Sequence, residues 1–106
     1  MIYMTEFTYP ASKAEEAGKV FMDVIQANPV PDYVKIVEIY QYWGGDGLKG
    51  HTYYNLEKGK EEEGVRYITI LTRELSKALV GYKPTNQIVY GLAEAYDTLG
   101  VAPPAL

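Results

Sequence analysis

Apolar residues recur along most of the chain at spacings that change from one segment to the next. Residues 1–9, MIYMTEFTY, are rich in aromatic side chains and alternate moderately, which predicts a strand that Pro10 ends. Over residues 13–28 the apolar positions recur every three or four residues, which predicts an amphipathic helix. The sequence NPVP at 28–31 ends this helix because proline cannot continue it.

The middle of the chain predicts a hairpin followed by a second helix. Residues 33–43, YVKIVEIYQYW, are mostly β-branched and aromatic, as strands are, and residues 50–57, GHTYYNLE, form the second strand. The glycine-rich segment GGDG at 44–47 predicts the turn between them. Residues 59–81 again have apolar positions at helical spacing, with glutamates in the first turn, where the helix dipole favours negative charge.

The C-terminal part of the sequence fits two interpretations. Residues 88–96, IVYGLAEAY, predict a last strand, whereas the overlapping GLAEAYDTLG also fits a short helix. In the strand, one face would carry the small side chains that suit close helix packing, namely Val89, Gly91, Ala93 and Ala95. We expect residues 1–100 to form a single domain and residues 101–106, VAPPAL, to be a loosely ordered tail.

The order of elements is therefore β-α-β-β-α-β, which predicts the α+β, ferredoxin-like arrangement of a four-stranded antiparallel sheet with two helices on one face. No predicted strand has a purely polar face. In the second strand, one alternating set of side chains is Val34, Ile36, Glu38, Tyr40 and Tyr42, and the other includes Val37 and Ile39. Because soluble monomers rarely expose such an apolar surface, we expect a homodimer that buries the two sheets against each other.

Composition narrows the classes of function. The net charge of −4 over 106 residues and the pI of about 4.9 argue against binding to nucleic acid or to anionic membranes. The N-terminal segment has no basic residue, unlike a signal peptide, and the absence of cysteine excludes thiolate chemistry, so a cytoplasmic location is expected. The 11 tyrosines, against 2 phenylalanines and 1 tryptophan, suit half-buried surfaces such as interfaces and pockets.

Four ionisable side chains are candidates for catalysis. His51, the only histidine, can act as a base or a ligand. A haem iron needs only one histidine ligand, so haem binding through His51 is not excluded, but no metal site and no cofactor are predicted. The alternative is a structural histidine at the start of a strand. Glu6, Glu38 and Glu94 lie among apolar neighbours, and on one sheet face they would converge in a low-dielectric cleft that raises their pKa. The alternative is that they are solvated edge charges or pair with Lys35 or with the partner chain.

Aromatic side chains are candidates for ligand binding. A set of tyrosines could line a pocket for a planar ligand by stacking and by hydrogen bonds from the hydroxyls, namely Tyr40, Tyr42, Tyr53, Tyr54, Tyr90 and Tyr96. Trp43, beside the hairpin turn, is a further candidate. The alternative for the tyrosines is packing at a dimer interface. The GGDG turn lacks the pattern GxxxxGK[ST] and opens no helix, so it does not predict a phosphate-binding loop.

The segments MIYMTEFTY, YQYWGGDG and GHTYYNLE resemble the dimeric α+β barrel superfamily and, within it, a family of small uncharacterised bacterial proteins. The shared features are an aromatic N-terminal strand, a hairpin turn ending in Asp46-Gly47, and a strand finishing in Leu56-Glu57. The LKGH segment after Asp-Gly and the acidic start of the second helix depart from that pattern. The superfamily includes cofactor-free oxygenases, haem-degrading enzymes and small-ligand binders, and no catalytic residue is carried over from it.

Three functions follow as hypotheses. The first is a small homodimer that binds an apolar or aromatic molecule in a cavity lined by tyrosine and glutamate. The second is a cofactor-independent oxygenase or isomerase that uses a glutamate or His51 as its base. The third is a structural or regulatory dimer without a ligand.

Overall fold

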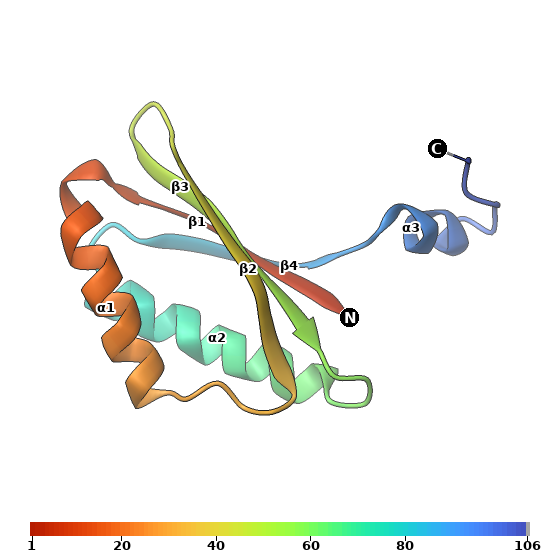
Figure 1. The fold of residues 1–106 in the computed structure, drawn as a ribbon, viewed down its shortest axis with the longest axis horizontal. Coiled ribbons are helices and arrows are strands. Elements are labelled where there is room, and N and C mark those ends of the chain that lie inside the picture. The colour runs from red at the N-terminus through yellow and green to blue at the C-terminus, as the bar shows by residue number, and fades with distance from the viewer. Residues whose placement is uncertain (106) are drawn as a thin grey trace.

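The computed structural model describes residues 1–105, so position 106 of the predicted tail lies outside the described residues. The chain forms, in order, β1 (Ile2–Pro10), a 3-10 turn (Ala11–Lys13), α1 (Ala14–Ala27), β2 (Val34–Trp43), β3 (Gly47–Leu56), α2 (Glu61–Ala78), β4 (Lys83–Val89) and α3 (Leu92–Thr98). All strand pairs are antiparallel, and the sheet has the order β2-β3-β1-β4. Helices α1 and α2 cover one face (Figure 1). The predicted ferredoxin-like fold is thus confirmed. None of the helices in the described part of the chain is both long and apolar enough to span a membrane.

The core lies between the sheet and the two helices. Tyr54 and Leu56 of β3 pack with Ile68 of α2, while Leu71 of α2 belongs to a second group shared with α1. Ile68 and Leu71 are fully buried. These contacts use alternate residues of the strands and one stripe of each helix, which explains why hydrophobic periodicity located them.

The last strand lies earlier than predicted. It spans Lys83–Val89, so the strand expected at 88–96 is wrong beyond its first two residues, and the alternative helix is observed as α3. Strand β4 is an edge strand that pairs only with β1, and an edge position tolerates Pro84 because only one side of the strand joins the ladder. The helix-facing surface of small residues expected over 89–95 is therefore absent: Val89 pairs with Ile2 on the other face, and the following residues lie beyond the sheet.

A β-bulge changes the direction of side chains in β2. The pairing with β3 shifts between Ile36 and Glu38, leaving Val37 as the extra residue. Ile36 pairs with the core residue Tyr54 and faces the helices, whereas Glu38 and every second residue after it face away. The single alternation predicted over 34–42 is wrong, because an inserted residue moves all later side chains to the opposite face.

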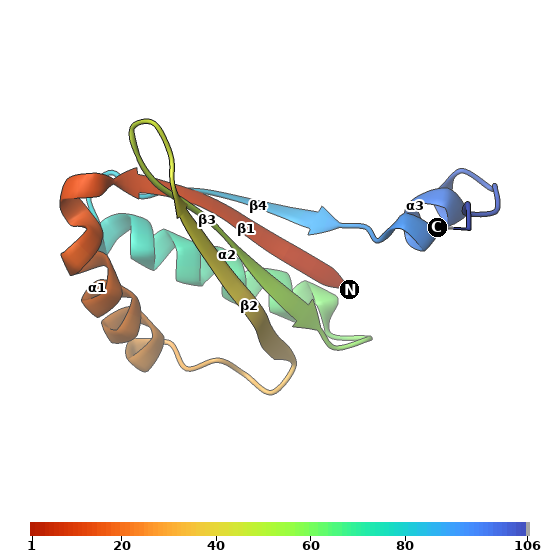
Figure 2. The same cartoon turned by 45° about the horizontal axis from the view of Figure 1, so that its top comes forward.

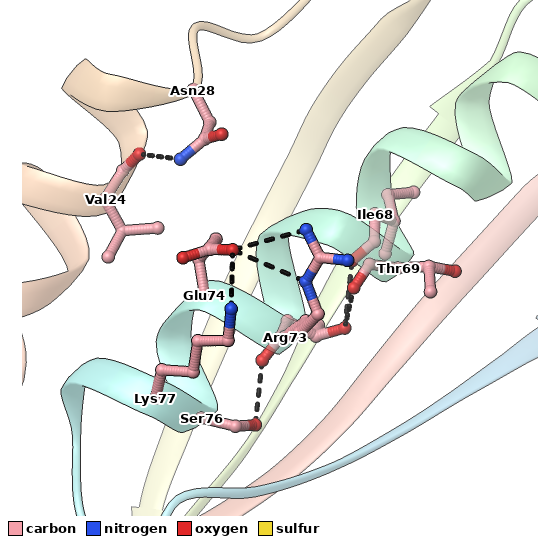
Figure 3. A network of polar contacts seen from close by, with 9 residues as sticks. Val24, Asn28, Ile68, Thr69, Arg73, Glu74, Ser76 and Lys77 are labelled. Carbon is pink, nitrogen blue, oxygen red and sulfur yellow. Dashed lines mark hydrogen bonds and ion pairs between the residues drawn. The ribbon is translucent and has the colours of Figure 1, made fainter.

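The outer surface of α2 carries solvent-exposed polar contacts (Figure 3). Glu74 accepts hydrogen bonds from Arg73, with Nη2 at 3.3 Å, and pairs with Lys77 at 3.5 Å. On α1, Asn28 Nδ2 donates to the carbonyl of Val24 at 3.0 Å and satisfies the end of that helix. Exposed ion pairs of this kind contribute about 1 kcal/mol or less. We therefore interpret this surface as a solvated helix face that adds little to stability.

Candidate ligand-binding site

A cavity of about 230 Å³ lies on the helix side of the sheet, between α1, α2 and the strands. Helix α1 contributes small side chains and one ring, α2 contributes one leucine, and three strands contribute mostly aromatic and polar groups. Leu79 and Tyr82 come from the turn between α2 and β4. The lining residues are Phe7, Tyr9, Ala14, Ala17, Gly18, Phe21, Ile39, Gln41, Thr52, Tyr54, Leu75, Leu79 and Tyr82. The cavity exists because small residues of α1 face large rings across the gap.

Three stacked rings form one wall of the cavity. Phe7 and Tyr9 are two residues apart on β1, so both side chains point toward the helices. Their ring centroids lie 6.1 Å apart with the planes 13° from parallel, and Phe7 stacks on Tyr82 at 5.8 Å. Gly50 makes this possible, since a Cβ at that position would collide with the Phe7 ring. The wall is therefore flat, aromatic and fixed by the sheet.

Polar groups in the cavity come mainly from tyrosine and glutamine. The Tyr9 hydroxyl donates to Oε1 of Gln41 at 2.9 Å, joining β1 to β2 across the intervening β3. No other hydrogen bond among the described residues engages the Gln41 side chain, so its amide nitrogen can donate to a bound molecule. Gln41 is solvent-exposed while Tyr9 is buried, which places this pair near the mouth of the cavity.

A buried polar network lies behind Tyr54. Thr5 Oγ1 donates to Asn86 Oδ1 at 2.6 Å, and Asn86 Nδ2 donates to Thr72 Oγ1 at 3.1 Å. The network ties β1, β4 and α2 together. Burial raises the pKa of Tyr54 to about 12, and hydrogen bonding with Thr5 and Thr52 offsets part of this shift. Tyr54 thus lines the cavity beside this network.

The cavity is uncharged at neutral pH. Burial raises the pKa of the Tyr9 hydroxyl and that of the Tyr82 hydroxyl, as it does for Tyr54, so all three remain protonated donors. None of the thirteen lining residues, all of which belong to the described part of the chain, is Asp, Glu, His, Lys or Arg. Chemically, the site can stack on a flat molecule and exchange hydrogen bonds with it, but it contains no acid or base that titrates near neutral pH.

Of the residues predicted as a site, Tyr54 lines the cavity, whereas most of the others lie on the opposite face of the sheet, which we call the open face. An aromatic ladder crosses β2 and β3 there, formed by Tyr40, Tyr42, His51 and Tyr53. Tyr42 stacks on His51 with centroids 6.2 Å apart, and Tyr40 meets Tyr53 edge-on at 6.0 Å. None of the four lines the cavity.

The remaining predicted residues are dispersed. Glu6 lies on the open face with Oε2 3.8 Å from His51 Nε2, and Glu38 lies two strands away on β2. Glu94 belongs to α3, outside the sheet. All three carboxylates are exposed, so the single chain does not enclose them in a cleft. Trp43 is exposed at the end of β2 and Tyr90 follows β4, and neither lines the cavity.

The cavity residues left out of the sequence prediction carried a detectable signal. Phe7 and Tyr9 share one face of the first strand, and Ala14, Ala17 and Gly18 share one face of the following helix. Small residues on a helix that faces aromatic residues on a sheet leave unfilled volume between the two layers. Gln41 had no such signal, because the bulge in β2 reversed its expected side.

No protein-family model matches the sequence, and no curated protein matches it. Solved structures match the fold at low identity. The de novo designed protein Foldit4 has a TM-score of 0.53 and 11% identity, over 85% of this chain and 94% of that chain. The C-terminal domain of the MgtC protein from Mycobacterium tuberculosis has a TM-score of 0.50 and 14% identity, over 81% and 86%. A candidate antibiotic biosynthesis monooxygenase from Caulobacter crescentus has a TM-score of 0.48 and 15% identity, over 85% and 90%. The first two likenesses support the ferredoxin-like fold alone, since one fold serves many functions.

Proposed function

We propose that the protein binds a small, uncharged aromatic molecule in the cavity between its helices and its sheet. The observation that carries this proposal is a cavity of about 230 Å³ with a stacked aromatic wall and no charged lining residue. Ligand sites are characteristically concave, mostly apolar and supplied with a few fixed polar groups. The Tyr9–Gln41 pair and the Tyr54 hydroxyl provide those groups here.

Volume and polarity together define the class of ligand. A cavity of about 150 Å³ accommodates benzene, so the larger cavity here suits one ring or two fused rings. A charged ligand would lose its hydration without gaining an ion-pair partner, which costs several kcal/mol. A phenol or naphthol fits better, because it can stack on Phe7 and Tyr82 and accept a hydrogen bond from Gln41.

Binding is a better proposal than proton-transfer catalysis. An oxygenase or isomerase of the cofactor-free kind needs a base beside its substrate. The imidazole and the carboxylates that were predicted for this role lie either on the open face, across the sheet from the cavity, or on α3, beyond the end of β4. We therefore infer a binding role for the cavity.

We propose further that the protein is a homodimer of the dimeric α+β barrel type, with two open faces packed together and a cytoplasmic location. Support comes from the aromatic ladder on the open face. Tyr40 and Tyr42 are each at least half exposed in the single chain, although they lie beside partly buried His51 and Tyr53. A partner sheet would cover these rings, as interfaces enriched in tyrosine do.

Calorimetric titration with 2-naphthol and with the anion 2-naphthoate tests the ligand class. We expect 2-naphthol to bind with a Kd of about 1 mM or tighter and 2-naphthoate to bind at least about tenfold more weakly. Gln41→Leu should weaken 2-naphthol binding by about three- to tenfold, the value of one hydrogen bond. Tyr42→Phe is the matched control, because its side chain leaves the same strand on the opposite face.

Amide chemical shifts during the titration locate the ligand. We expect the largest changes around Phe7, Tyr54 and Leu79, which line the cavity. Equal affinity for the two compounds, no binding of either, or shifts confined to Tyr40 and Tyr42 would overturn the proposed ligand site.

A further inference from the structure

The C-terminal arm, residues 90–105, stands away from the rest of the molecule (Figures 1 and 2). Its helix is capped by hydrogen bonds within the arm: Gly91 N–H donates to the Glu94 carboxylate at 3.3 Å, and Ala95 N–H donates to the Gly91 carbonyl at 2.9 Å. Within the described chain, no hydrogen bond joins residues 91–105 to residues 1–89. The arm is thus a preformed element without a partner in its own chain.

The arm exposes apolar side chains of the kind that a helix usually buries against a neighbouring element. Leu92, Leu99 and Val101 are all exposed, Leu99 to 72%. A helix with uncovered apolar side chains loses the burial that normally stabilises a short helix in water. Contact with another surface would supply that burial.

The whole chain exposes more surface than its mass requires. Its accessible surface is 6968 Å², whereas a compact monomer of 11.9 kDa exposes about 6,000 Å². The radius of gyration is 15.5 Å, against about 13 Å for a compact domain of this length. The excess of about 1,000 Å² is close to the roughly 800 Å² that each partner buries in a stable interface.

Charge on the arm complements charge on the open face. The arm carries Glu94 and Asp97 and no basic residue. The register of the sheet places three lysines on the open face, Lys35, Lys49 and Lys83, where they outnumber the two glutamates, Glu6 and Glu38. The apolar arm residues would meet the aromatic ladder while the acids meet lysines.

We propose that the C-terminal arm of each chain packs on the open face of a second copy. This inference rests on the homodimer proposed above and adds to it the arm, which would cover the ladder together with the partner sheet. In this structure the arm leaves β4 in the direction away from the sheet, so it does not lie on the ladder of its own chain (Figure 2).

Light scattering after size exclusion, over a range of concentrations, tests both the homodimer and the contact between the arm and the open face. We expect the full chain to have about twice its 11.9 kDa mass. Leu99→Glu should raise the dimer dissociation constant at least about tenfold, because a carboxylate would be buried without a partner. Val80→Glu is the matched control: Val80 is exposed to 73%, as Leu99 is to 72%, but it lies between α2 and β4. Since both positions are exposed in the single chain, neither change should unfold it.

Cross-linking between chains shows where the arm lies. Because the sequence contains no cysteine, only the introduced thiols react with the cross-linker. A tagged chain with Leu99→Cys is mixed with an untagged chain carrying Tyr42→Cys or Tyr53→Cys, and a short bismaleimide is added. We expect a product that contains one chain of each kind, and none when Val80→Cys replaces Leu99→Cys.

The outcomes separate the two levels. A monomeric full chain would overturn both the homodimer and the arm contact. A dimer that tolerates Leu99→Glu as well as Val80→Glu, and that gives no product between chains, would overturn the arm contact and leave the homodimer in place. A third sample is one chain that carries both Leu99→Cys and Tyr42→Cys. Cross-links found only within that chain would show that the arm folds back on its own sheet, and would also overturn the arm contact between chains.

Discussion

Replacing Gly18 separates the stability of α1 from the volume of the cavity. Gly18 lies within α1 and lines the cavity, and a Cβ at this position would meet no heavy atom within 4 Å. A side chain can therefore be added without a clash. Glycine in the interior of a helix costs about 0.5–1 kcal/mol relative to alanine, so Gly18→Ala should raise the free energy of unfolding by that amount.

A larger side chain at Gly18 should stabilise the protein while blocking the ligand. Leucine is nearly as good a helix former as alanine, so Gly18→Leu should gain a similar amount, plus about 1 kcal/mol from apolar contact with Phe21. About 4–8 °C of melting temperature corresponds to each kcal/mol in a domain of this size. The leucine side chain would occupy part of the 230 Å³ that 2-naphthol needs, which should weaken binding by at least about tenfold.

Thermal unfolding followed by far-UV circular dichroism, together with calorimetric titration, measures both effects. We expect both variants to melt above the parent, and only Gly18→Leu to lose 2-naphthol binding. A Gly18→Leu protein that melts below the parent would show that the space beside Gly18 is filled in solution. Unchanged affinity in Gly18→Leu would show that the ligand binds elsewhere.

Two further predictions concern the buried polar groups. Burial raises the folded-state pKa of Tyr54 from 10.0 to about 12. The protonated Tyr54 hydroxyl therefore stabilises the fold fully below pH 10, and this contribution falls by about 1.4 kcal/mol per pH unit as the pH rises from 10 toward 12. Urea unfolding near about pH 9 and about pH 11 should show this slope, and Tyr54→Phe should reduce it; an unchanged slope would contradict the assignment. Asn86→Ala removes the acceptor of the Thr5 hydroxyl and should cost about 1–3 kcal/mol, whereas Gln87→Ala, exposed on the other face, should change urea stability by about 0.5 kcal/mol or less. Equal effects of the last two changes would argue against the network.

The outcome for β4 shows where sequence periodicity stops being informative. Helices α1 and α2 were predicted within a few residues because each buries one apolar stripe. In β4 the corresponding inward position is Asn86, whose half-buried amide is satisfied by Thr5 and Thr72. A hydrogen-bonded amide replaces the apolar residue that the alternation would require, so the strand reads as a polar loop. Its pairing with β1 depends on contacts distant in sequence, which a local pattern does not contain.

Phe7, Tyr9 and the small residues of α1 indicated where a cavity could lie, but its volume was beyond prediction for a different reason. Each lining residue is of a type found in ordinary cores, and Phe7 or Leu79 would look the same in a filled interior. The empty volume depends on how far α1 stands from the sheet, and that distance is set by tertiary packing. The glutamates expected in a cavity are on other surfaces, because strand parity does not indicate which face the helices cover. The bulge at Val37 then reversed the expected side of half of β2.

The two faces of the sheet meet in β2. Gln41 points toward the cavity, and Tyr42, the next residue, points toward the open face. Strand β2 lies at the edge of the sheet and pairs with β3 alone, so its part beyond the core residues Val34 and Ile36 is held by that pairing and by the Tyr9–Gln41 hydrogen bond. A partner that covers Tyr42 would hold β2 in place and with it the Gln41 amide at the mouth of the cavity. Loss of the dimer through Leu99→Glu should therefore weaken 2-naphthol binding by about two- to fivefold, although Leu99 is not in the cavity. Titration of this variant at concentrations where it is monomeric measures the coupling, and an affinity equal to that of the parent dimer would show that the two faces act independently.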